Sequence, residues 1–467
     1  MAQRTKESVP CQVESEIKKL ESSEGLPFRE LLAPETISAA LESAGVEFRD
    51  RIYNPMVTLY AFLSQVIAKK DSSCQDAVSR VLADRVARRE KACSPDSSSY
   101  CAARARLPGQ VVEGLTCETG QKLHQQAHAN WKWNGRDVVI VDGSTATMAD
   151  TEENQDEFPQ SRNQKKGLGF PILRFVAFLS LSVGTVLECA IGACRGKKTG
   201  EQSLFRQMWD ALKSGNILLG DRLYDAYRDI ALLQARGVDV VFGKKQSRRC
   251  DFRSGKKLGP DDHVVVWKKP KHNASRFESR EEWESLPDTL KMREVRATIR
   301  RKGFRTRKVI IVTTLVDAEL YSGKELTDLF AQRWHCELDL RSIKRALGMH
   351  HLRCKTPDMI RKELWTYLLA YNLIRVRMAQ AAAVRGVMPR KLSFTAAKNH
   401  IHNFAPHLKT ASEADRQRFE TELLRAIAHC RVGNRPGRKE PRAVKKRDQT
   451  FSYLTKPRAQ ARQRLPA

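Results

Sequence analysis

The sequence predicts an α/β protein in which helices pack on a mixed β-sheet, after a helical N-terminal region and around a mainly β insertion. Three observations support this prediction. Apolar residues recur at three- and four-residue steps from Asn54 to about His128, which is the helical period. From 129 to 243, strand-like apolar runs alternate with helical runs. Between 244 and 317 the chain is basic and rich in β-formers, as in HVVVWKKPK.

Two of the predicted core strands end at aspartates. The run RDVVIVDGST contains a buried strand that ends at Asp142, and ILLGDRLY contains a shorter one that ends at Asp221. Between them, ILRFVAFLSLSVGTVLECAIGACRG is expected to form two long strands that turn at 183–185, and residues 200–215 are expected to form a helix. A helix and the strand VDVVFGKK follow Asp221. This order is typical of an α/β layer with polar residues at the strand ends.

A long helix is expected after the insertion. Its start is marked by a capping box of Ser322 and Glu325, and Gly348 can end it. On an ideal helix, four side chains of this segment project within an arc of about 60°; they are Phe330, Arg333, Glu337 and Lys344. Taken alone, such a stripe is commonly a surface ion pair. A second long helix is expected over 363–386.

The two strand-end aspartates change the interpretation of this stripe. Asp142, Asp221 and Glu337 fit a carboxylate triad that binds two Mg²⁺ ions about 4 Å apart. Oxygen ligands suit Mg²⁺, and such a pair of ions can activate a nucleophile and stabilise a departing oxygen at a phosphodiester. Arg333 and Lys344 would then contact substrate phosphates beside the acids. The alternative for each aspartate alone is a helix-cap or turn residue.

The charge of the chain points to a polyanionic partner. There are 83 Lys+Arg against 54 Asp+Glu, a net charge of +29, and in a protein of this kind the usual partner is nucleic acid. The last 38 residues hold twelve Lys+Arg, two Asp+Glu and four prolines, which predicts a disordered polycation. A short helix between Ser98 and Pro108 carries Arg104 and Arg106 as candidate DNA contacts. A solvated basic helix in a small bundle is the alternative.

Membrane and disulfide classes are disfavoured. No run of 18 or more apolar residues occurs, and the N-terminus has no apolar signal-peptide core, so a cytoplasmic protein without membrane contact is expected. Eleven cysteines without a CxxC pair favour reduced thiols over disulfides or a structural zinc site. One possible zinc cluster lacks a second ligand pair at the usual spacing; it consists of Cys336, His350, His351 and Cys354.

At the three acids the chain resembles the DDE transposases of bacterial cut-and-paste insertion sequences. The resemblance is to the branch whose third acid lies in a signature of tyrosine, two residues, arginine, three residues, glutamate, six residues and lysine. Here the spacing is complete, with Phe330 in place of the tyrosine, which removes a hydroxyl but keeps a stacking ring. VDGSTATMADTEENQDEFP and GDRLYDAY are the family-like contexts of the other two acids, although Glu152 stands where many relatives have proline. The resemblance covers about 137–377.

The resemblance implies a ribonuclease-H-like catalytic core in which Asp142, Asp221 and Glu337 are catalytic metal ligands for two Mg²⁺ ions, with Mn²⁺ as a substitute. It implies double-stranded DNA as partner, both transposon ends and target, and a homodimer in the DNA complex, in a bacterial cytoplasm and associated with the nucleoid. It also implies cleavage of each end, often through a hairpin, and joining of 3′-hydroxyls to target DNA. The further candidates for DNA contact are Arg333, Lys344, Phe330, Arg222 and Trp334. Trp283 is a second candidate for stacking on a displaced base.

These expectations divide the chain into six regions: an N-terminal helical DNA-binding region (1–128), the first part of the core (129–243), the β-rich insertion (244–317), the second part of the core (318–395), a helical region (396–430) and the basic tail (431–467). Two alternatives to a transposase remain open. One is a metal-dependent nuclease on the same fold, and the other is a transposase-derived DNA-binding regulator without activity.

Overall fold

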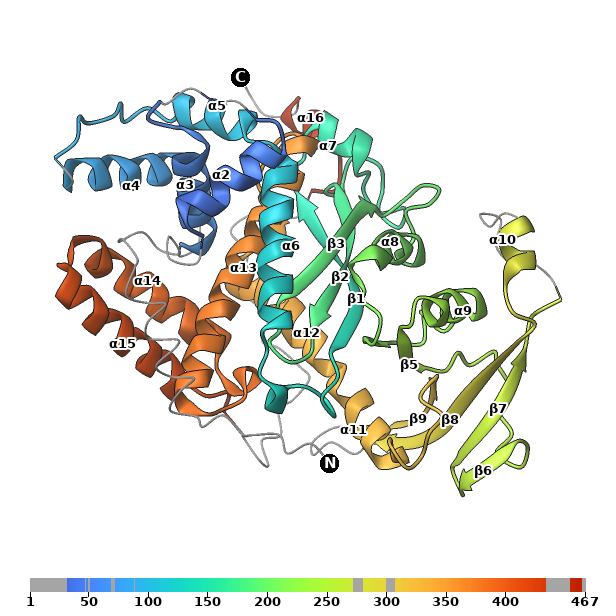
Figure 1. The fold of residues 1–467 in the computed structure, drawn as a ribbon. Coiled ribbons are helices and arrows are strands. Elements are labelled where there is room, and N and C mark those ends of the chain that lie inside the picture. Colours follow the sequence, from blue (N-terminus) through green and yellow to red (C-terminus); the bar gives the residue numbers. More distant parts are fainter. Residues whose placement is uncertain are drawn as a thin grey trace.

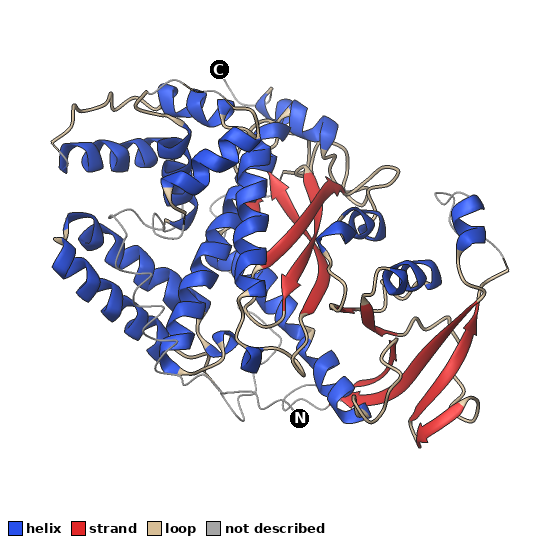
Figure 2. Ribbon diagram, in the orientation of Figure 1, coloured by secondary structure: helices blue, strands red, loops and turns tan. Residues whose placement is uncertain are grey.

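The computed structural model describes residues 32–46, 48, 51–68, 72–87, 89–271, 280–299, 307–433 and 454–463. Helices from both ends of the chain lie beside a twisted β-sheet, and the insertion strands extend away from it on the opposite side (Figure 1). Coloured by secondary structure, the molecule shows one mainly helical half and one half built around the sheet (Figure 2). The predicted α/β class with N-terminal helices is confirmed.

The N-terminal region is helical, as the apolar periodicity predicts. The side chain of Asn54 caps one of its helices by accepting a hydrogen bond from the Val57 N–H at 3.0 Å. The helices are α2 (Pro34–Ser43), α3 (Pro55–Ile67), α4 (Cys74–Ala87), α5 (Ser98–Arg106) and α6 (Gly109–Gln125). Of these, α6 lies along the later helix α13 (Pro357–Arg385), so the N-terminal region joins the core.

Five strands form the core of the sheet in the order β3-β2-β1-β4-β5. The first three are antiparallel neighbours, while β4 and β5 run parallel to β1. Their bounds are β1 (Val138–Met148), β2 (Ile172–Ser180), β3 (Val186–Ala193), β4 (Ile217–Gly220) and β5 (Asp239–Gly243). A two-residue strand, β10 (His351–Leu352), pairs parallel with the end of β1.

Both faces of this sheet are covered, which explains the continuous apolar runs. Val138 and Ile140 belong to a core shared with α6 and α13, whereas Val139 and Val141 belong to a second core shared with α8 (Glu201–Gln207) and α9 (Tyr227–Ala235). Successive residues of a strand point to opposite faces, so a strand buried on both sides has no polar alternation.

The insertion extends the same sheet rather than forming a separate one. Its last strand, β9, pairs with core strand β5 through Val241 opposite Thr313, and β8, β7 and β6 follow outward, all antiparallel. The predicted mainly β character is therefore observed. The elements are β6 (Lys256–Gly259), β7 (Asp262–Lys268), α10 (Arg280–Ser285), β8 (Thr289–Ile299) and β9 (Arg307–Thr313).

The expected long helix is divided. The capping box is present, since Ser322 and Glu325 exchange side-chain to backbone hydrogen bonds, and Gly348 ends the segment with φ +100°. However, the helical run changes its hydrogen bonding twice: it is made of α11 (Gly323–Gln332), α12 (Trp334–Arg341) and a π-helical turn labelled η3 (Ser342–Leu347). A π turn holds more residues per turn than an α turn, so ideal 100° steps fail beyond Arg341.

Three further boundaries differ from the expectations. Strand β1 continues past Asp142 to Met148, although its fully buried part stops just before Asp142. The helix expected over 200–215 ends at Gln207 and is followed by the short turn η2 (Trp209–Ala211). Helix α13 begins six residues before the predicted start at 363, because Pro357 supplies a favourable first position.

The remaining elements are α7 (Glu152–Glu157), α14 (Phe394–Thr410), α15 (Glu413–His429), α16 (Arg458–Arg462) and the 3₁₀ turns η1 (Ala129–Trp131) and η4 (Pro389–Lys391). Within the basic tail, α16 is helical, which differs from the expected disorder; most of the tail, 434–453 and 464–467, lies outside the described residues. No helix in the described ranges is both long and apolar enough to cross a bilayer.

Candidate active site

Asp142 lies on β1, and Asp221 directly follows the end of β4, the parallel neighbour of β1; the two carboxylates are close enough to interact electrostatically. Val138 pairs with Ile217 and Ile140 with Leu219, and the same register continued upward brings Asp142 opposite Asp221. Residues opposite each other in a sheet point to the same face. The two strand-end carboxylates are therefore juxtaposed, as the strand pattern predicts.

Glu337 reaches the same place from α12. One guanidinium nitrogen of Arg333 lies 3.9 Å from Asp142 Oδ2, and another donates a hydrogen bond to Glu337 Oε1 at 3.4 Å. One arginine side chain thus bridges the strand acid and the helix acid. The structure brings together all three acids that the sequence singles out.

A fourth acid, Glu201, lies in the same cluster and was missed in the sequence. It is the first residue of α8, on the opposite face of the sheet, and its carboxylate approaches the sheet where Gly143 has no side chain. A Cβ on Gly143 would lie 2.6 Å from the Glu201 carboxyl carbon. The Tyr224 hydroxyl donates a hydrogen bond to Glu201 Oε1 at 2.8 Å and holds it there.

Backbone hydrogen bonds fix one oxygen of each aspartate. The Gly143 N–H donates to Asp142 Oδ1 at 2.9 Å, and the Leu223 N–H donates to Asp221 Oδ1 at 2.7 Å. Each aspartate therefore keeps its second oxygen, Oδ2, for another ligand. A carboxylate with one oxygen anchored in this way is oriented before any ligand arrives.

The cluster has an excess of negative charge in a partly buried position. The pKa of Asp142 is raised to about 6, mainly by burial, with Asp221 and Glu201 adding to the rise, while the Gly143 N–H and Arg333 oppose it. The negatively charged form of Asp142 therefore has a cost in free energy, because its surroundings favour the protonated form. A cation beside these oxygens would relieve that cost.

The donor set fits the Mg²⁺ ions expected from the sequence. Asp142, Asp221 and Glu337 offer hard carboxylate oxygens, the ligands that Mg²⁺ prefers, with Mn²⁺ as a chemically similar substitute. The raised pKa of Asp142 is the observation in favour, because burial first, and then the nearby Asp221 and Glu201 carboxylates, disfavour its negative form when no cation is beside it. Glu201 adds charge to the same site from the other face of the sheet.

We expect Asp142→Asn to stabilise the metal-free protein at high pH. Between about pH 4 and pH 6 the native state binds more protons at Asp142 than the unfolded state, so stability falls as pH rises, and above about pH 6 the full cost is present. Removing the charge should recover about 1–2 kcal/mol at about pH 8 and little at about pH 4. Thermal unfolding in EDTA measures this. Asp210→Asn, at an exposed site, is the control, and an equal effect at both pH values would contradict the account.

The remaining signature residues also lie close to the acids. Lys344 donates a hydrogen bond to the Ser144 hydroxyl at 3.0 Å, two residues along β1 from Asp142. Phe330 is a correction to the expected DNA contacts, because it is only 8% exposed and belongs to the apolar core. Its ring points at Gly243, where a Cβ would lie 3.3 Å from its Cζ. The backbone N–H of Arg222 approaches the same glycine, while the Arg222 side chain is exposed. The signature therefore surrounds the acids, although not as one stripe of an ideal helix.

Arg104 is a correction to the expected DNA contacts. Its side chain is only 9% exposed, and it donates to Gln65 Oε1 at 3.0 Å and to Cys354 Sγ at 3.1 Å. It also stacks over the ring of Phe62. Arg104 thus ties α5 to the core and is not available to a DNA phosphate, whereas Arg106 is exposed.

The two candidate stacking tryptophans are both half-buried. Trp334 begins α12 beside the acids, and Trp283 on α10 packs against the core shared with α9. The possible zinc cluster is not assembled within the described part of the chain. Of its members, Cys354 accepts from Arg104 and His351 Nδ1 lies 3.0 Å from the Thr147 hydroxyl.

The model of the transposase DDE domain family matches residues 133–373, which is more than half of the chain and includes all three acids. The chain belongs to the DDE transposase family. It is 28% identical over 371 residues to the transposase InsG of insertion sequence element IS4 from Escherichia coli strain K12, covering 77% of this chain and 78% of that protein.

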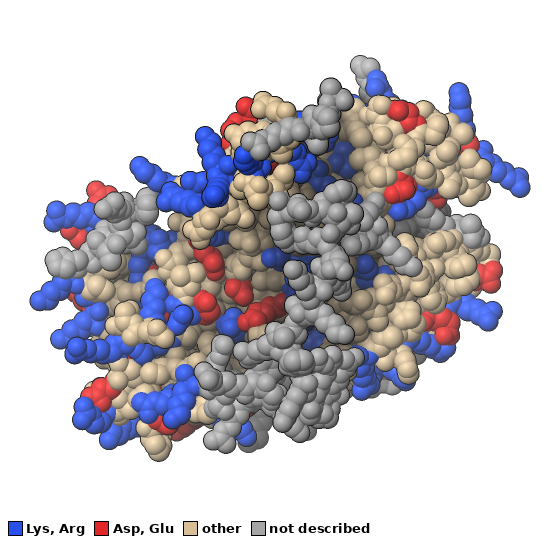
Figure 3. Space-filling view, turned by 180° about the vertical axis from the view of Figure 1, so that it is seen from behind, with Lys and Arg blue, Asp and Glu red and all other residues tan. Residues whose placement is uncertain are grey.

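Among solved structures, the transposase is similar to a piggyBac transposase synaptic complex with hairpin DNA, with a TM-score of 0.43, 9% identity and coverage of 89% of each chain. Membership in the family and the observed mixed sheet agree with the α/β core that the sequence predicts. The basic character of the transposase is visible on its surface, where Lys and Arg are spread over both ends of one face, with acidic side chains near its middle (Figure 3).

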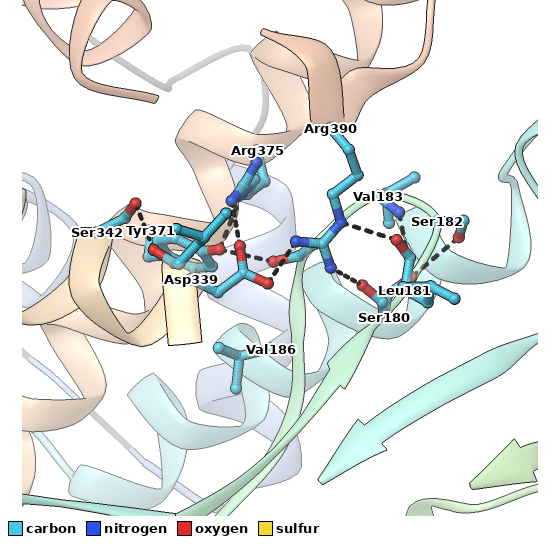
Figure 4. A network of polar contacts seen from close by, with 12 residues as sticks. Ser180, Leu181, Ser182, Val183, Val186, Asp339, Ser342, Tyr371, Arg375 and Arg390 are labelled. Atoms are coloured by element: carbon cyan, nitrogen blue, oxygen red, sulfur yellow. Dashed lines mark hydrogen bonds and ion pairs between the residues drawn. The ribbon is translucent and has the colours of Figure 1, made fainter. Parts of the chain in front are cut away.

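A buried ionic network positions Glu337 in this DDE transposase. Asp339, two residues further along α12, is fully buried and accepts hydrogen bonds from Arg375 of α13 and, at 2.5 Å, from Arg390 (Figure 4). Arg390 also donates to the carbonyl oxygens of Ser180, the last residue of β2, and Leu181, in the turn that follows. The network joins α12 to α13 and to the sheet. These contacts fix the orientation of α12, the helix that carries Glu337.

Neither Glu201 nor Asp339 was identified from the sequence. Glu201 follows Gly200 at the start of a predicted helix, where an acid is ordinarily explained by the helix dipole. Asp339 lies two residues after Glu337 and is the one charged residue between Leu338 and Leu340. For Asp339, the available signal was a charged residue between two leucines on a predicted core helix.

Proposed function

We propose that the protein is an active DNA transposase. It binds the terminal inverted repeats of its element, cleaves the ends by Mg²⁺-dependent hydrolysis and hairpin formation, and joins the 3′-hydroxyl ends to target DNA. The observation that carries the proposal is the bridging of Asp142 and Glu337 by Arg333, with Asp221 beside Asp142 in the sheet register. A chain that no longer cut DNA would have no need to hold these acids together.

In this proposal, Asp142, Asp221 and Glu337 hold two Mg²⁺ ions. When bound, the ions would activate the attacking water or 3′-hydroxyl and neutralise the departing oxygen. Arg333 orients Asp142 and Glu337 and contacts a phosphate near the cleaved bond. Lys344, placed by Ser144, contacts a second phosphate.

The other DNA contacts are assigned from exposure and position. Arg222, exposed and directly after Asp221, and Arg106, exposed on α5, contact phosphates. Trp334 is the candidate for stacking on a displaced base. Two protomers grip the two ends in a homodimer, in the cytoplasm of a bacterium and on its nucleoid.

The test uses the purified protein and DNA fragments that carry the ends of its own element. Wild-type protein with Mg²⁺ or Mn²⁺ should nick the ends, and denaturing gels should show a hairpin before a double-strand break. Pre-cut ends should join to a target plasmid. Cleavage without joining would favour the nuclease alternative, and end binding without cleavage in either metal would favour the inactive regulator.

Glu201→Gln should raise the Mg²⁺ concentration required for half-maximal cleavage by about tenfold, the usual effect of removing a group that supports metal ligands. The amide keeps the hydrogen bond from Tyr224 but removes a charge beside Asp142. A Mg²⁺ titration of end cleavage measures the shift. Glu284→Gln, on exposed α10, is the control, and an unchanged Mg²⁺ requirement would show that Glu201 has only a structural role.

A further inference from the structure

A second cluster of metal-ligating side chains lies in the insertion, apart from the four acids. Cys250 lies in the loop after β5, His263 on β7 and Glu294 on β8, and one ligand atom from each lies within 4.8 Å of the other two. His263 and Glu294 are cross-strand partners in the sheet. The cluster is therefore built by regular strand pairing and not by a chance contact of surface loops.

The second atoms of two of these side chains are already committed to hydrogen bonds. His263 Nδ1 lies 2.8 Å from the Ser254 carbonyl oxygen, which can only accept, so Nδ1 donates a hydrogen and Nε2 is the nitrogen directed at the other two side chains. The Trp267 indole N–H donates to Glu294 Oε1 at 3.0 Å, leaving Oε2 directed at His263. Such outer partners orient the ligands in known metal sites.

The inner atoms face each other in a buried space. His263 Nε2 lies 3.3 Å from Glu294 Oε2 and 3.9 Å from Cys250 Sγ, and both His263 and Glu294 are almost fully buried. Two acceptors at 3.3 Å out of contact with water require a proton or a cation between them. In a tetrahedral zinc site, bond lengths place a nitrogen and an oxygen ligand about 3.3 Å apart and a nitrogen and a sulfur ligand about 3.5 Å apart.

We propose that Cys250, His263 and Glu294 bind one Zn²⁺ ion, with water in the fourth position on the partly exposed Cys250 side. A thiolate, an imidazole and a carboxylate together suit Zn²⁺ better than Mg²⁺, which selects oxygen ligands alone. The site is independent of the proposed function, because none of its ligands belongs to the acidic cluster. The sequence favoured reduced thiols over a structural zinc site because the eleven cysteines are scattered and include no CxxC pair.

The proposed ion would fix the loop between β5 and β6. In this loop the Lys245 N–H donates to Asp225 Oδ2 at 2.9 Å, and Arg248 donates to Asp225 Oδ1 at 3.3 Å while stacking over Trp267. Asp225 belongs to the turn that begins at Asp221. A zinc ion at Cys250 therefore holds one end of the loop to β7 and β8 while Asp225 holds the other to the active site.

Cobalt substitution tests the proposal directly. We would use the full chain with Asp142→Asn and Asp221→Asn, so that the acidic cluster does not compete for metal, and add Co²⁺ to the chelator-treated protein. The expected result is one tightly bound cobalt per chain with the near-ultraviolet charge-transfer absorption of a cobalt–thiolate bond. Cys250→Ser should abolish this absorption, and Cys101→Ser, at an exposed thiol, should retain it.

Zinc content and thermal unfolding give a second measurement. In the same background, purified protein should carry about one zinc per chain, and Glu294→Gln should reduce this to less than about a tenth. EDTA should lower the unfolding temperature of the background protein by several degrees but leave that of Cys250→Ser unchanged. Absence of the thiolate absorption together with no retained zinc in folded protein would overturn the proposal.

Discussion

Glu337→Gln is expected to reduce end cleavage by about a thousandfold, equivalent to about 4 kcal/mol of lost transition-state stabilisation. Glutamine keeps the size of the side chain but removes the charge that binds a divalent cation. Glu337 is about 40% exposed and its charge is not needed inside the fold, so the protein should remain folded. End binding should be retained or slightly strengthened, because the variant repels phosphates less.

Cleavage and binding must be measured on the same preparation. A gel assay for nicked ends gives the first quantity and a mobility shift in EDTA gives the second. Asp328→Asn, which removes an exposed carboxylate from neighbouring α11, is the matched control and should cleave normally. If Glu337→Gln cut DNA at the wild-type rate in Mg²⁺, the third acid would have no part in the chemistry.

Asp339→Asn is expected to produce the largest loss of stability, about 3–5 kcal/mol. Two guanidinium groups, those of Arg375 and Arg390, converge on this buried carboxylate. An amide cannot neutralise them, so the variant leaves two positive charges inside the protein. Removing one member of a buried ion network costs more stability than replacing all of its members by apolar residues, because the remaining charges are left unpaired.

Urea unfolding followed by circular dichroism measures this loss as a lower midpoint. Asp261→Asn, which breaks an exposed pair with Arg296, is the control and should change stability by less than about 1 kcal/mol. Asp339→Asn protein that stays folded at low temperature should also cleave DNA ends poorly, because α12 loses the ion pairs that fix its orientation. A midpoint equal to that of the control would show that the network contributes little.

Much of the site is predictable from sequence because it depends on local patterns. Asp142 and Asp221 each follow apolar strand runs, and parallel pairing of those strands is sufficient to bring them together. Glu337 could be identified as the third acid only from the residue spacing that this segment shares with the family. The fold class followed from the same runs, since strands buried on both faces need helices on both sides.

The parts that could not be predicted depend on contacts between distant segments. From the sequence, Arg104 is expected to be a surface residue. Its burial depends on its contact with Cys354, which is 250 residues away in the chain. Glu201 joins the acids because Gly143 lets a helix from the opposite face approach. The π turn that begins at Ser342 changes the phase of Lys344, and nothing in the local sequence marks it.

The pairing of β5 with β9 has a mechanical consequence. Because the outer strands are hydrogen-bonded in series to the strand beside Asp221, the projecting arm cannot swing on a flexible tether without breaking the ladder from Val241 to Gly243. A force applied at the outer strands would therefore be transmitted through the paired strands to β5 and β4, beside Asp221. The angle between the insertion and the core is thus fixed by the sheet itself.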